Sequence, residues 1–387
     1  MTIYRAYDAS TGAYPPARLP AVPRADRPRL STAASKSYPS CFDATRAATF
    51  ARGRYALLHA LRSVGVDERH AVALPAYHCR TMIDPALRLC AMPFFFAMRP
   101  DLAPDLERLS DSVARADRPV LLPHYFGFMQ DIEPVLAFCR SHGIALIEDC
   151  CHSYFGGRAG HVVGSVGDCA IGSPGKFFAT DEGGTFRSNT GAAAPEQSAR
   201  SWSDEARAAY RSAEAAFALL RRRWTGAGID RLAAEFAAVR ARYASGPGDL
   251  VTDEADRWSK HYDPRQETLS ATRWSRWLMR HGDIERLCER RRAHFKQWLQ
   301  SVATLPNCQP LFATLPDGVV PYMFPLLIEQ PDQRFHWLKH LGVPMFRWDE
   351  LAASDCEGSA HLRLHLVHLP CHQAMLPGDM AWSIAAL

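Results

Sequence analysis

Two residues of this sequence, Asp149 and Lys176, could do chemistry together. Asp149 ends the apolar run Ile144–Asp149, and Lys176 follows 27 residues later between a proline–glycine pair and two phenylalanines. A lysine amine can form a Schiff base with a carbonyl, and a carboxylate can keep a pyridine nitrogen protonated. The pair therefore predicts a site for pyridoxal phosphate (PLP), whose protonated ring acts as an electron sink.

Lys176 is one of only three lysines in the first 260 residues. Lys36 lies in a segment rich in proline, serine and alanine, and Lys260 lies in an expected linker, which leaves Lys176 as the candidate for imine formation. Its aromatic neighbours predict partial burial, which would lower the pKa of its ammonium group. The alternative for Lys176 is an exposed loop lysine without a chemical role.

Asp149 and His152 could instead have purely structural roles. A buried carboxylate needs a partner, and a pyridinium would be one, but an aspartate at a strand end is also a common helix N-cap. His152 could form a hydrogen bond or stack at the edge of the cofactor ring, or it could be a structural histidine.

Further residues could hold the phosphate and the face of the cofactor. Ser173 could donate a hydrogen bond to a phosphate. At a helix start, Gly53, Arg54 and Tyr55 could supply backbone N–H groups and a guanidinium. One of three consecutive residues could place a ring or a thiol against the cofactor, and the sequence leaves open which one: Tyr77, His78 or Cys79.

Other kinds of active site lack their sequence patterns. There is no GxSxG, no Walker A sequence and no GxGxxG. His365, His368 and His372 lack carboxylates at a spacing typical of zinc sites. We therefore expect no metal.

Strands alternate with helices from residue 45 to residue 190, which predicts crossover units and a mostly parallel sheet covered on both faces. In such sheets ligands bind at the carboxyl ends of the strands. The residues at or just after expected strand ends are Tyr77, His124, Asp149 and Ser173. The expected strands are 71–77, 92–98, 119–127, 144–149, 169–173 and 183–188, and the expected helices are 45–65, 82–92, 105–115 and 131–143.

The chain is divided into three parts on the basis of composition. Residues 1–45 are expected to form an extended or poorly ordered arm, 46–260 a large domain, and 261–387 a small α+β domain. Within the large domain, 191–245 predicts two helices with a break at Thr225. A further helix is expected over 269–302. The basic runs 221–223 and 290–292 are expected on solvated helix faces, with contact to an anionic ligand as the alternative.

Composition limits the class of protein. The 387 residues carry 45 basic and 41 acidic side chains, a balance that gives no reason to expect nucleic-acid binding. Eleven cysteines without a CxxC pattern favour reduced thiols. The first 20 residues lack the apolar core of a signal peptide, and no stretch of about 18 apolar residues predicts a membrane span. We therefore expect a soluble, cytoplasmic protein.

Ordered blocks of the sequence resemble the DegT/StrS-type family of PLP-dependent aminotransferases, best known for aminating keto-sugar nucleotides. The resemblance covers most of residues 45–190 and 265–375. Its N-terminal blocks are LPAY…C, HYFG…D, IEDCCHS, VGSVGD and SPGKFF…EGG, and its C-terminal blocks are GVPMFRWDE and LVHLPCHQ.

This resemblance implies an aspartate-aminotransferase-like α/β fold, PLP fold type I, with a smaller C-terminal domain. Lys176 would attach the cofactor and move protons, and Asp149 would hold the pyridinium. His152 would lie beside the ring, and Ser173 would bind phosphate. An amino acid, glutamate or glutamine, would donate the amino group to a keto substrate. The implied assembly is a homodimer with the site at its interface.

Three features depart from the family pattern. Gly53-Arg54-Tyr55-Ala56 stands where relatives have Gly-Thr/Ser-x-Ala, so an arginine could replace the hydroxyl contact. No Asn-Tyr-Arg stretch occurs near 261–275, and the segment 191–260 is unlike the usual linker.

Two alternative functions remain open. Related dehydratases carry histidine in place of the lysine, so Lys176 argues against that reaction. A non-catalytic binding or regulatory protein on the same scaffold is the other alternative, because fold does not determine function.

Overall fold

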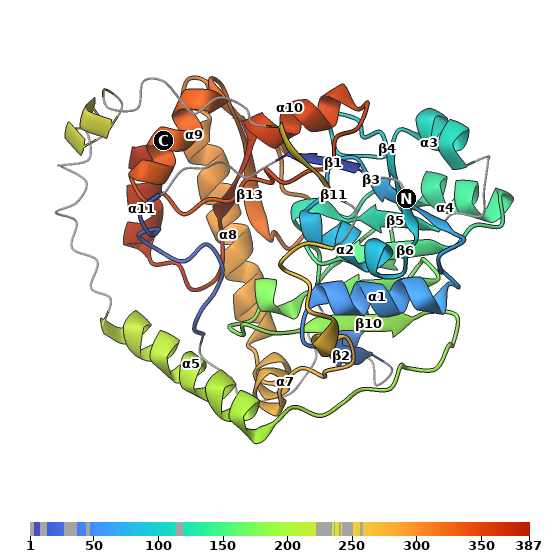
Figure 1. Ribbon diagram of the computed structural model, residues 1–387. Helices are drawn as coiled ribbons and strands as arrows, with labels where there is room; N and C mark the ends of the chain where they lie inside the picture. Colours follow the sequence, from blue (N-terminus) through green and yellow to red (C-terminus); the bar gives the residue numbers. More distant parts are fainter. Residues whose placement is uncertain are drawn as a thin grey trace.

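A seven-stranded sheet forms the centre of the molecule (Figure 1). The computed structural model describes residues 4–7, 14–26, 37–43, 47–113, 119–221, 234–235, 237–239, 241, 251–255 and 258–387. In spatial order the strands are β2 (Ala48–Phe50), β10 (Gly184–Ser188), β9 (Cys169–Gly172), β6 (Leu146–Cys150), β5 (Val120–Pro123), β3 (Ala71–Pro75) and β4 (Met92–Phe96). The five strands from β9 to β4 are parallel, and β10 and β2 add to the sheet in antiparallel pairs.

Helices cover both faces of this sheet. Successive residues of a strand point to opposite faces, so Val72 and Leu74 pack with helices α1 (Gly53–Ser63) and α2 (Arg80–Arg88). Ala73 lies in the other core cluster, with residues of α3 (Leu106–Val113) and α4 (Ile132–Ser141). Burial on both faces explains why these strands read as continuous apolar runs. The predicted α/β class with a mostly parallel sheet is confirmed.

The C-terminal part has its own sheet and core. Strands β12 (Cys308–Pro310), β13 (Met323–Ile328) and β14 (Leu366–Pro370) form a three-stranded antiparallel sheet. Its core includes Trp298, Phe324 and Trp382. The helices of this part are α8 (Ile284–Val302), α9 (Pro331–His340), α10 (Glu357–His365) and α11 (Pro377–Ala386).

Helix α5 (Trp202–Arg221) lies along the edge of the molecule beside α7 (Arg273–Arg280), apart from the central sheet (Figure 1). The indole nitrogen of Trp274 donates to Ser212 Oγ at 2.9 Å and connects the two helices. The first strand, β1 (Tyr4–Tyr7), pairs with β11 (Val251–Ala255). Among the described residues, no helix has both the length and the apolar character needed to cross a membrane.

The remaining elements are short. Two-residue strands β7 (Gly157–Arg158) and β8 (His161–Val162) form a small hairpin, and 3-10 turns occur at Cys41–Asp43, Tyr125–Gly127, Pro174–Lys176 and Pro264–Gln266.

Three predicted helical segments differ from the structure. The segment 191–260, expected to be helical, forms α5 only from Trp202, because Ser198 pairs with Leu269 in an extended bridge, and its later part contains strand β11. The helix expected from residue 45 begins at Gly53, because residues 48–50 form β2 and pair with β10. The helix expected over 269–302 is divided into α7 and α8 at Gly282, where an added Cβ would lie 2.7 Å from the ring of Phe178. Asp283 then caps α8 by accepting from Arg286 N–H.

The prediction that residues 290–292 form a solvated face is wrong for Arg291, whose side chain is fully buried. Several predicted features lie outside the described residues: the break at Thr225, Arg222 and Arg223, and parts of the N-terminal arm.

Candidate active site

A cavity of about 530 Å³ lies at the carboxyl ends of β6 and β9. Asp149 and Lys176 both line it, together with Ser173. The parallel register pairs Asp149 with Ile171, so β6 and β9 end side by side. Ser173 follows β9 directly, and the short turn Pro174–Lys176 then brings the lysine back over the strand ends. Backbone pairing thus carries the acid and the amine to the same cavity.

The N-terminus of α1 opens into the same cavity, which Gly53 and Arg54 also line. The carbonyl of Arg52 accepts from the N–H groups of Tyr55 and Ala56, whereas the N–H of Arg54 has no acceptor among the described residues. Nη1 of Arg54 is also buried without a hydrogen-bond partner there. An unsatisfied N–H donor at a helix N-terminus, with an adjacent guanidinium and the Ser173 hydroxyl, fits a phosphate group.

At this end of the sheet, glycines allow neighbouring backbone segments to approach one another closely. A Cβ on Gly184 would lie 2.1 Å from the carbonyl oxygen of Arg52, and one on Gly53 would lie 3.4 Å from Cys151 Sγ. Gly183 has a φ of +118° and forms a bridge with Arg52. The Gly183-Gly184 pair noted in the sequence therefore brings β10 against the start of α1.

Lys176 is enclosed by polarisable and polar groups. Its Nζ lies 5.3 Å from the centre of the Tyr322 ring. Burial lowers the pKa of the ammonium group, but Tyr322, Cys151, Cys79 and Asp149 favour the charged form, and the net pKa is raised. The expectation of a lowered pKa is therefore wrong, because the neighbours outweigh the loss of solvation.

Asp149 is 3% exposed, and its carboxylate accepts the N–H of Cys151 at 2.9 Å. A turn follows β6, so Asp149 does not cap a helix as its structural alternative supposed. The adjacent Glu148 has different partners from Asp149. Its carboxylate accepts hydrogen bonds from the N–H groups of Gly164, Val166 and Gly167 and pairs with His124. With these partners Glu148 anchors the loop before β9.

Cys150 completes a potential metal-binding group with Glu148 and His124, the one such group among the described residues. The hydrogen bonds of Glu148 satisfy its oxygens without an ion. Burial raises the pKa of Glu148, but the bonds from His124 and the loop N–H groups prevail and the net pKa is lowered.

Of the three consecutive candidates for the cofactor face, only Cys79 lines the lysine cavity. Tyr77 is buried, with its hydroxyl 3.0 Å from His368 Nε2. His78 is bound by backbone groups of Pro75 and Ala352.

Two further predicted residues lie behind the cavity rather than in its lining. Tyr55 donates its hydroxyl to the carbonyl of Asp263. His152 is buried with its ring 4.4 Å from that of Tyr322, which does line the cavity. Burial, followed by the charge of Lys176, holds the pKa of His152 well below its usual value, so its ring is neutral.

Several residues that line the lysine cavity were not predicted from the sequence. Tyr322 precedes β13, Phe346 follows α9, and Arg211 lies on α5. Nothing in their local sequence signals a place beside Lys176, because long-range packing brings them there. Cys151 and Arg52 are different, since both are adjacent to predicted site residues and could have been included.

Arg291 of α8 connects the lysine turn to the C-terminal sheet. Its guanidinium donates to the carbonyls of Lys176 at 2.8 Å and of Pro321 and Tyr322 at 3.1 Å each. Its Nε donates to the side-chain oxygen of Gln373 at 3.0 Å. One buried side chain therefore holds the backbone of Lys176 in a set position relative to Tyr322.

The chain has the fold of PLP-dependent transferases of type I, similar to aspartate aminotransferase. Solved structures share the fold. Aminotransferase TlmJ from Streptoalloteichus hindustanus aligns with a TM-score of 0.60 at 18% identity, over 88% of this chain and 84% of its own. Helicobacter pylori PseC, an aminotransferase of pseudoaminic acid biosynthesis, aligns with a TM-score of 0.59 at 15% identity, over 88% and 84%.

Residues 40–206 match the DegT/DnrJ/EryC1/StrS aminotransferase family, so the predicted family resemblance is confirmed for this part of the chain. GDP-perosamine synthase of Vibrio cholerae is 26% identical over 147 residues, 37% of this chain and 40% of its own. L-glutamine:2-deoxy-scyllo-inosose aminotransferase of Streptomyces kanamyceticus is 28% identical over 137 residues, 34% and 32%. The aligned part spans at most about two fifths of these curated relatives' length.

Proposed function

We propose that this protein is a PLP-dependent aminotransferase. It moves an amino group from an amino acid, glutamate or glutamine, to a keto-sugar nucleotide or a related ketone. One observation carries the proposal: Lys176, Asp149 and the unsatisfied N-terminus of α1 line the same cavity. The names of relatives, which include a glutamine-dependent inosose aminotransferase, support the choice of donor and acceptor.

The residues present fit the cofactor. The backbone N–H and the guanidinium of Arg54, together with Ser173, would hold its phosphate. Asp149 would hold its ring nitrogen, and Lys176 would attach its carbonyl carbon. When bound, PLP supplies an electron sink for negative charge that develops on the carbon of the substrate.

The protein's own groups do the remaining work. In its neutral form, Lys176 Nζ would take up the proton at the reacting carbon and then return it, since it is the amine that lines the cavity in the described structure. Arg291 orients the lysine turn through its backbone carbonyls. The ring of Tyr322, which lines the cavity 5.3 Å from Lys176 Nζ, would exclude water from the amine.

Covalent labelling tests the assignment of Lys176. The protein is incubated with PLP, reduced with borohydride and digested, and mass spectrometry should find the cofactor on the peptide that contains Lys176. Lys176→Ala should abolish the label. Lys260→Ala, which changes an exposed lysine outside the cavity, should keep it. Absence of a label, or a label on another lysine only, would refute the proposal.

The reaction is tested with glutamate and glutamine as donors. Without an acceptor, the PLP-loaded enzyme, not treated with borohydride, should release about one equivalent of 2-oxo acid per site. A screen of keto-sugar nucleotides against simple ketones then identifies the acceptor. PLP binding without oxo-acid release from any donor would favour the dehydratase or the non-catalytic scaffold instead.

A cytoplasmic location and a homodimer, both expected from the sequence and the family resemblance, belong to the same proposal. Light scattering of the PLP-loaded protein should give twice the chain mass. A mass equal to that of one chain would contradict the proposed homodimer.

A further inference from the structure

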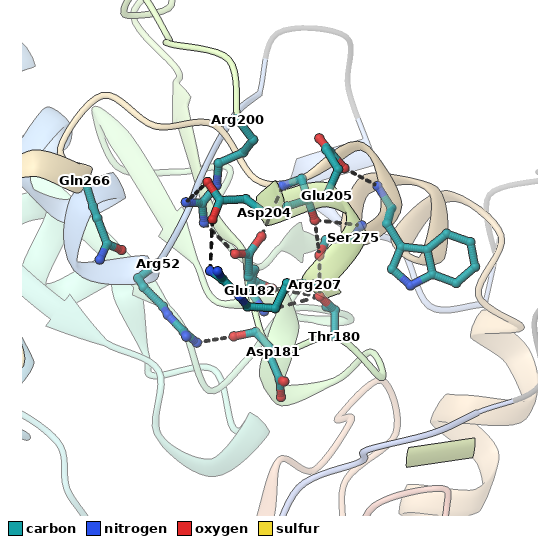
Figure 2. Close-up of polar contacts among 12 residues, drawn as sticks. Arg52, Thr180, Asp181, Glu182, Arg200, Asp204, Glu205, Arg207, Gln266 and Ser275 are labelled. Carbon is teal, nitrogen blue, oxygen red and sulfur yellow. Dashed lines mark hydrogen bonds and ion pairs between the residues drawn. The ribbon is translucent and has the colours of Figure 1, made fainter. Parts of the chain in front are cut away.

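A second and larger cavity, of about 810 Å³, lies between α5 and the loop that follows Lys176. Six residues line both this cavity and the lysine cavity: Arg24, Arg52, Thr180, Asp181, Glu182 and Arg211. Because the two spaces share this wall, a molecule that reacts at Lys176 can extend into the larger one. Figure 2 shows the polar groups around it.

Most charges of this cavity are already paired. Arg200 contacts Glu182 at 2.5 Å and Asp204 at 3.8 Å, and Arg207 contacts Asp204 at 3.2 Å (Figure 2). Asp181 pairs with Arg24 at 2.7 Å. The carboxylates nearest the junction of the two cavities are therefore neutralised by their own partners.

Two guanidinium groups at the junction have no carboxylate partner in the described part of the chain: Arg52 and Arg211. Arg52 donates to the backbone carbonyl of Asp181, and burial lowers its pKa. Glu214 has no recorded ion pair among the described residues either, but it lines only the larger cavity and not the junction. The junction therefore carries a surplus of positive charge.

A buried donor also points to a ligand. The side chain of Arg200 is 9% exposed and lines the larger cavity, and its Nε is buried without a hydrogen-bond partner among the described residues. Leaving such a donor unsatisfied costs free energy unless a ligand accepts its hydrogen bond. The donor and the junction arginines belong to the same cavity.

We propose that the larger cavity binds an oxyanion group, a carboxylate or a phosphate, of a substrate whose reacting carbon lies against Lys176. Arg211 and Arg52 hold this group at the junction, because guanidinium groups bind such oxyanions with paired hydrogen bonds. The proposal rests on the proposed aminotransferase function. It gives α5 a role in selecting the substrate.

Equilibrium binding to the PLP-loaded enzyme tests this site. Inorganic pyrophosphate and glutarate, a dicarboxylate without the amino group that reacts, serve as separate probes in titration calorimetry. Arg211→Gln is suited to the test because Arg211 is exposed, so the fold should tolerate the change. Loss of charge-assisted hydrogen bonds should weaken binding of at least one probe by about tenfold or more. Arg52→Gln should have the same effect.

The control is Arg276→Gln on α7, since Arg276 is exposed and lines neither cavity. Weaker binding of pyrophosphate alone would assign the site to a phosphate of the acceptor. Weaker binding of glutarate alone would assign it to a carboxylate of the donor. Unchanged binding of both probes to Arg211→Gln, or an equal loss in Arg276→Gln, would overturn the proposal.

Labelling of Lys176 in the same samples separates this site from the proposed function. Normal labelling together with unchanged probe binding would refute only the oxyanion site. Missing labelling removes the proposed function whatever the probes show.

Discussion

His78 shows how hydrogen bonds determine the state of a single side chain. Its Nδ1 lies 2.8 Å from the carbonyl of Pro75, and its Nε2 lies 3.0 Å from the N–H of Ala352. The first nitrogen must donate and the second must accept, which defines one neutral tautomer. Burial lowers the pKa of His78 from 6.5 to about 4. A proton on Nε2 would replace an accepted hydrogen bond with a repulsive contact.

This arrangement predicts a pH dependence of stability. Between pH 6.5 and pH 4, His78 is protonated in the unfolded chain but neutral in the folded chain. The free energy of unfolding therefore falls as the pH falls. The contribution between pH 7 and pH 5 should be about 2 kcal/mol. His78→Gln can keep both hydrogen bonds and should reduce this pH dependence in urea unfolding.

The matched control is His142→Gln, which changes an exposed histidine at the end of α4. It should leave the difference between pH 7 and pH 5 as in the parent protein. An unchanged difference in His78→Gln would show that the proton is taken up elsewhere.

At the scale of elements, the position of α1 depends on its contact with β10. The carbonyl of Arg52 packs against Gly184, and the N–H of Gly183 donates to Ala51 at 3.0 Å. This contact directs the start of α1 toward Ser173 and Lys176, which line the cavity with it. Strand β10 and the N-terminus of α1 together create the proposed phosphate site.

Gly184→Ala should disturb this contact, because the added methyl would lie 2.1 Å from the Arg52 carbonyl oxygen. We expect a loss of about 1 to 3 kcal/mol in the free energy of unfolding, measured in urea. Binding of PLP should weaken as well, since the first N–H groups of α1 move with Arg52.

Gly358→Ala provides the comparison. Gly358 lies in α10, and its added Cβ would be 3.4 Å from the nearest atom, the carbonyl oxygen of Met98. Alanine favours a helix more than glycine does, so this variant should be at least as stable as the parent. Equal stability of the two variants would argue that the backbone near Gly184 can move freely.

At the scale of the whole molecule, the cavity depends on the contact between the large sheet and the C-terminal part. Lys176 comes from the large sheet, whereas Tyr322 leads into β13. Arg291 and Gln373 donate to the backbone of the lysine turn from the C-terminal side, with Gln373 Nε2 2.7 Å from the carbonyl of Phe177. The two parts of the protein are therefore coupled at the residue proposed to react.

Arg291→Met should be strongly destabilising, because it removes the donor to the carbonyl of Lys176 and leaves the buried carbonyls of Pro321 and Tyr322 with only the weak thiol donor of Cys371. A loss of about 3 kcal/mol or more in the free energy of unfolding is expected. Arg291→Lys should recover only part of it, since an ammonium group lacks the planar fork of arginine. Borohydride labelling of Lys176 should decline in both variants.

Arg140→Met, at the exposed end of α4, removes a similar side chain without buried partners among the described residues and should change neither property. Normal stability of Arg291→Met would mean that water or backbone movement replaces the guanidinium.

The sequence by itself determined the alternation of strands and helices, and with it the places of Asp149, Ser173 and Lys176 at strand ends. It could do so because burial of a parallel strand leaves a continuous apolar run and because strand ends share one edge of the sheet. The family blocks in residues 45–190 follow the same local order. The reliable predictions were therefore those of strands in continuous apolar runs and of the residues that follow them.

Only the tertiary structure decided which side chains surround the lysine. Cys79 faces the cavity and Tyr77 does not, Arg291 is buried within a basic run, and α5 contributes Arg211 to the junction. The direction of the Lys176 pKa also depends on groups brought there by folding. The physical reason is that burial, hydrogen-bond partners and charge at a cavity are set by contacts between segments far apart in the chain, which local periodicity does not encode.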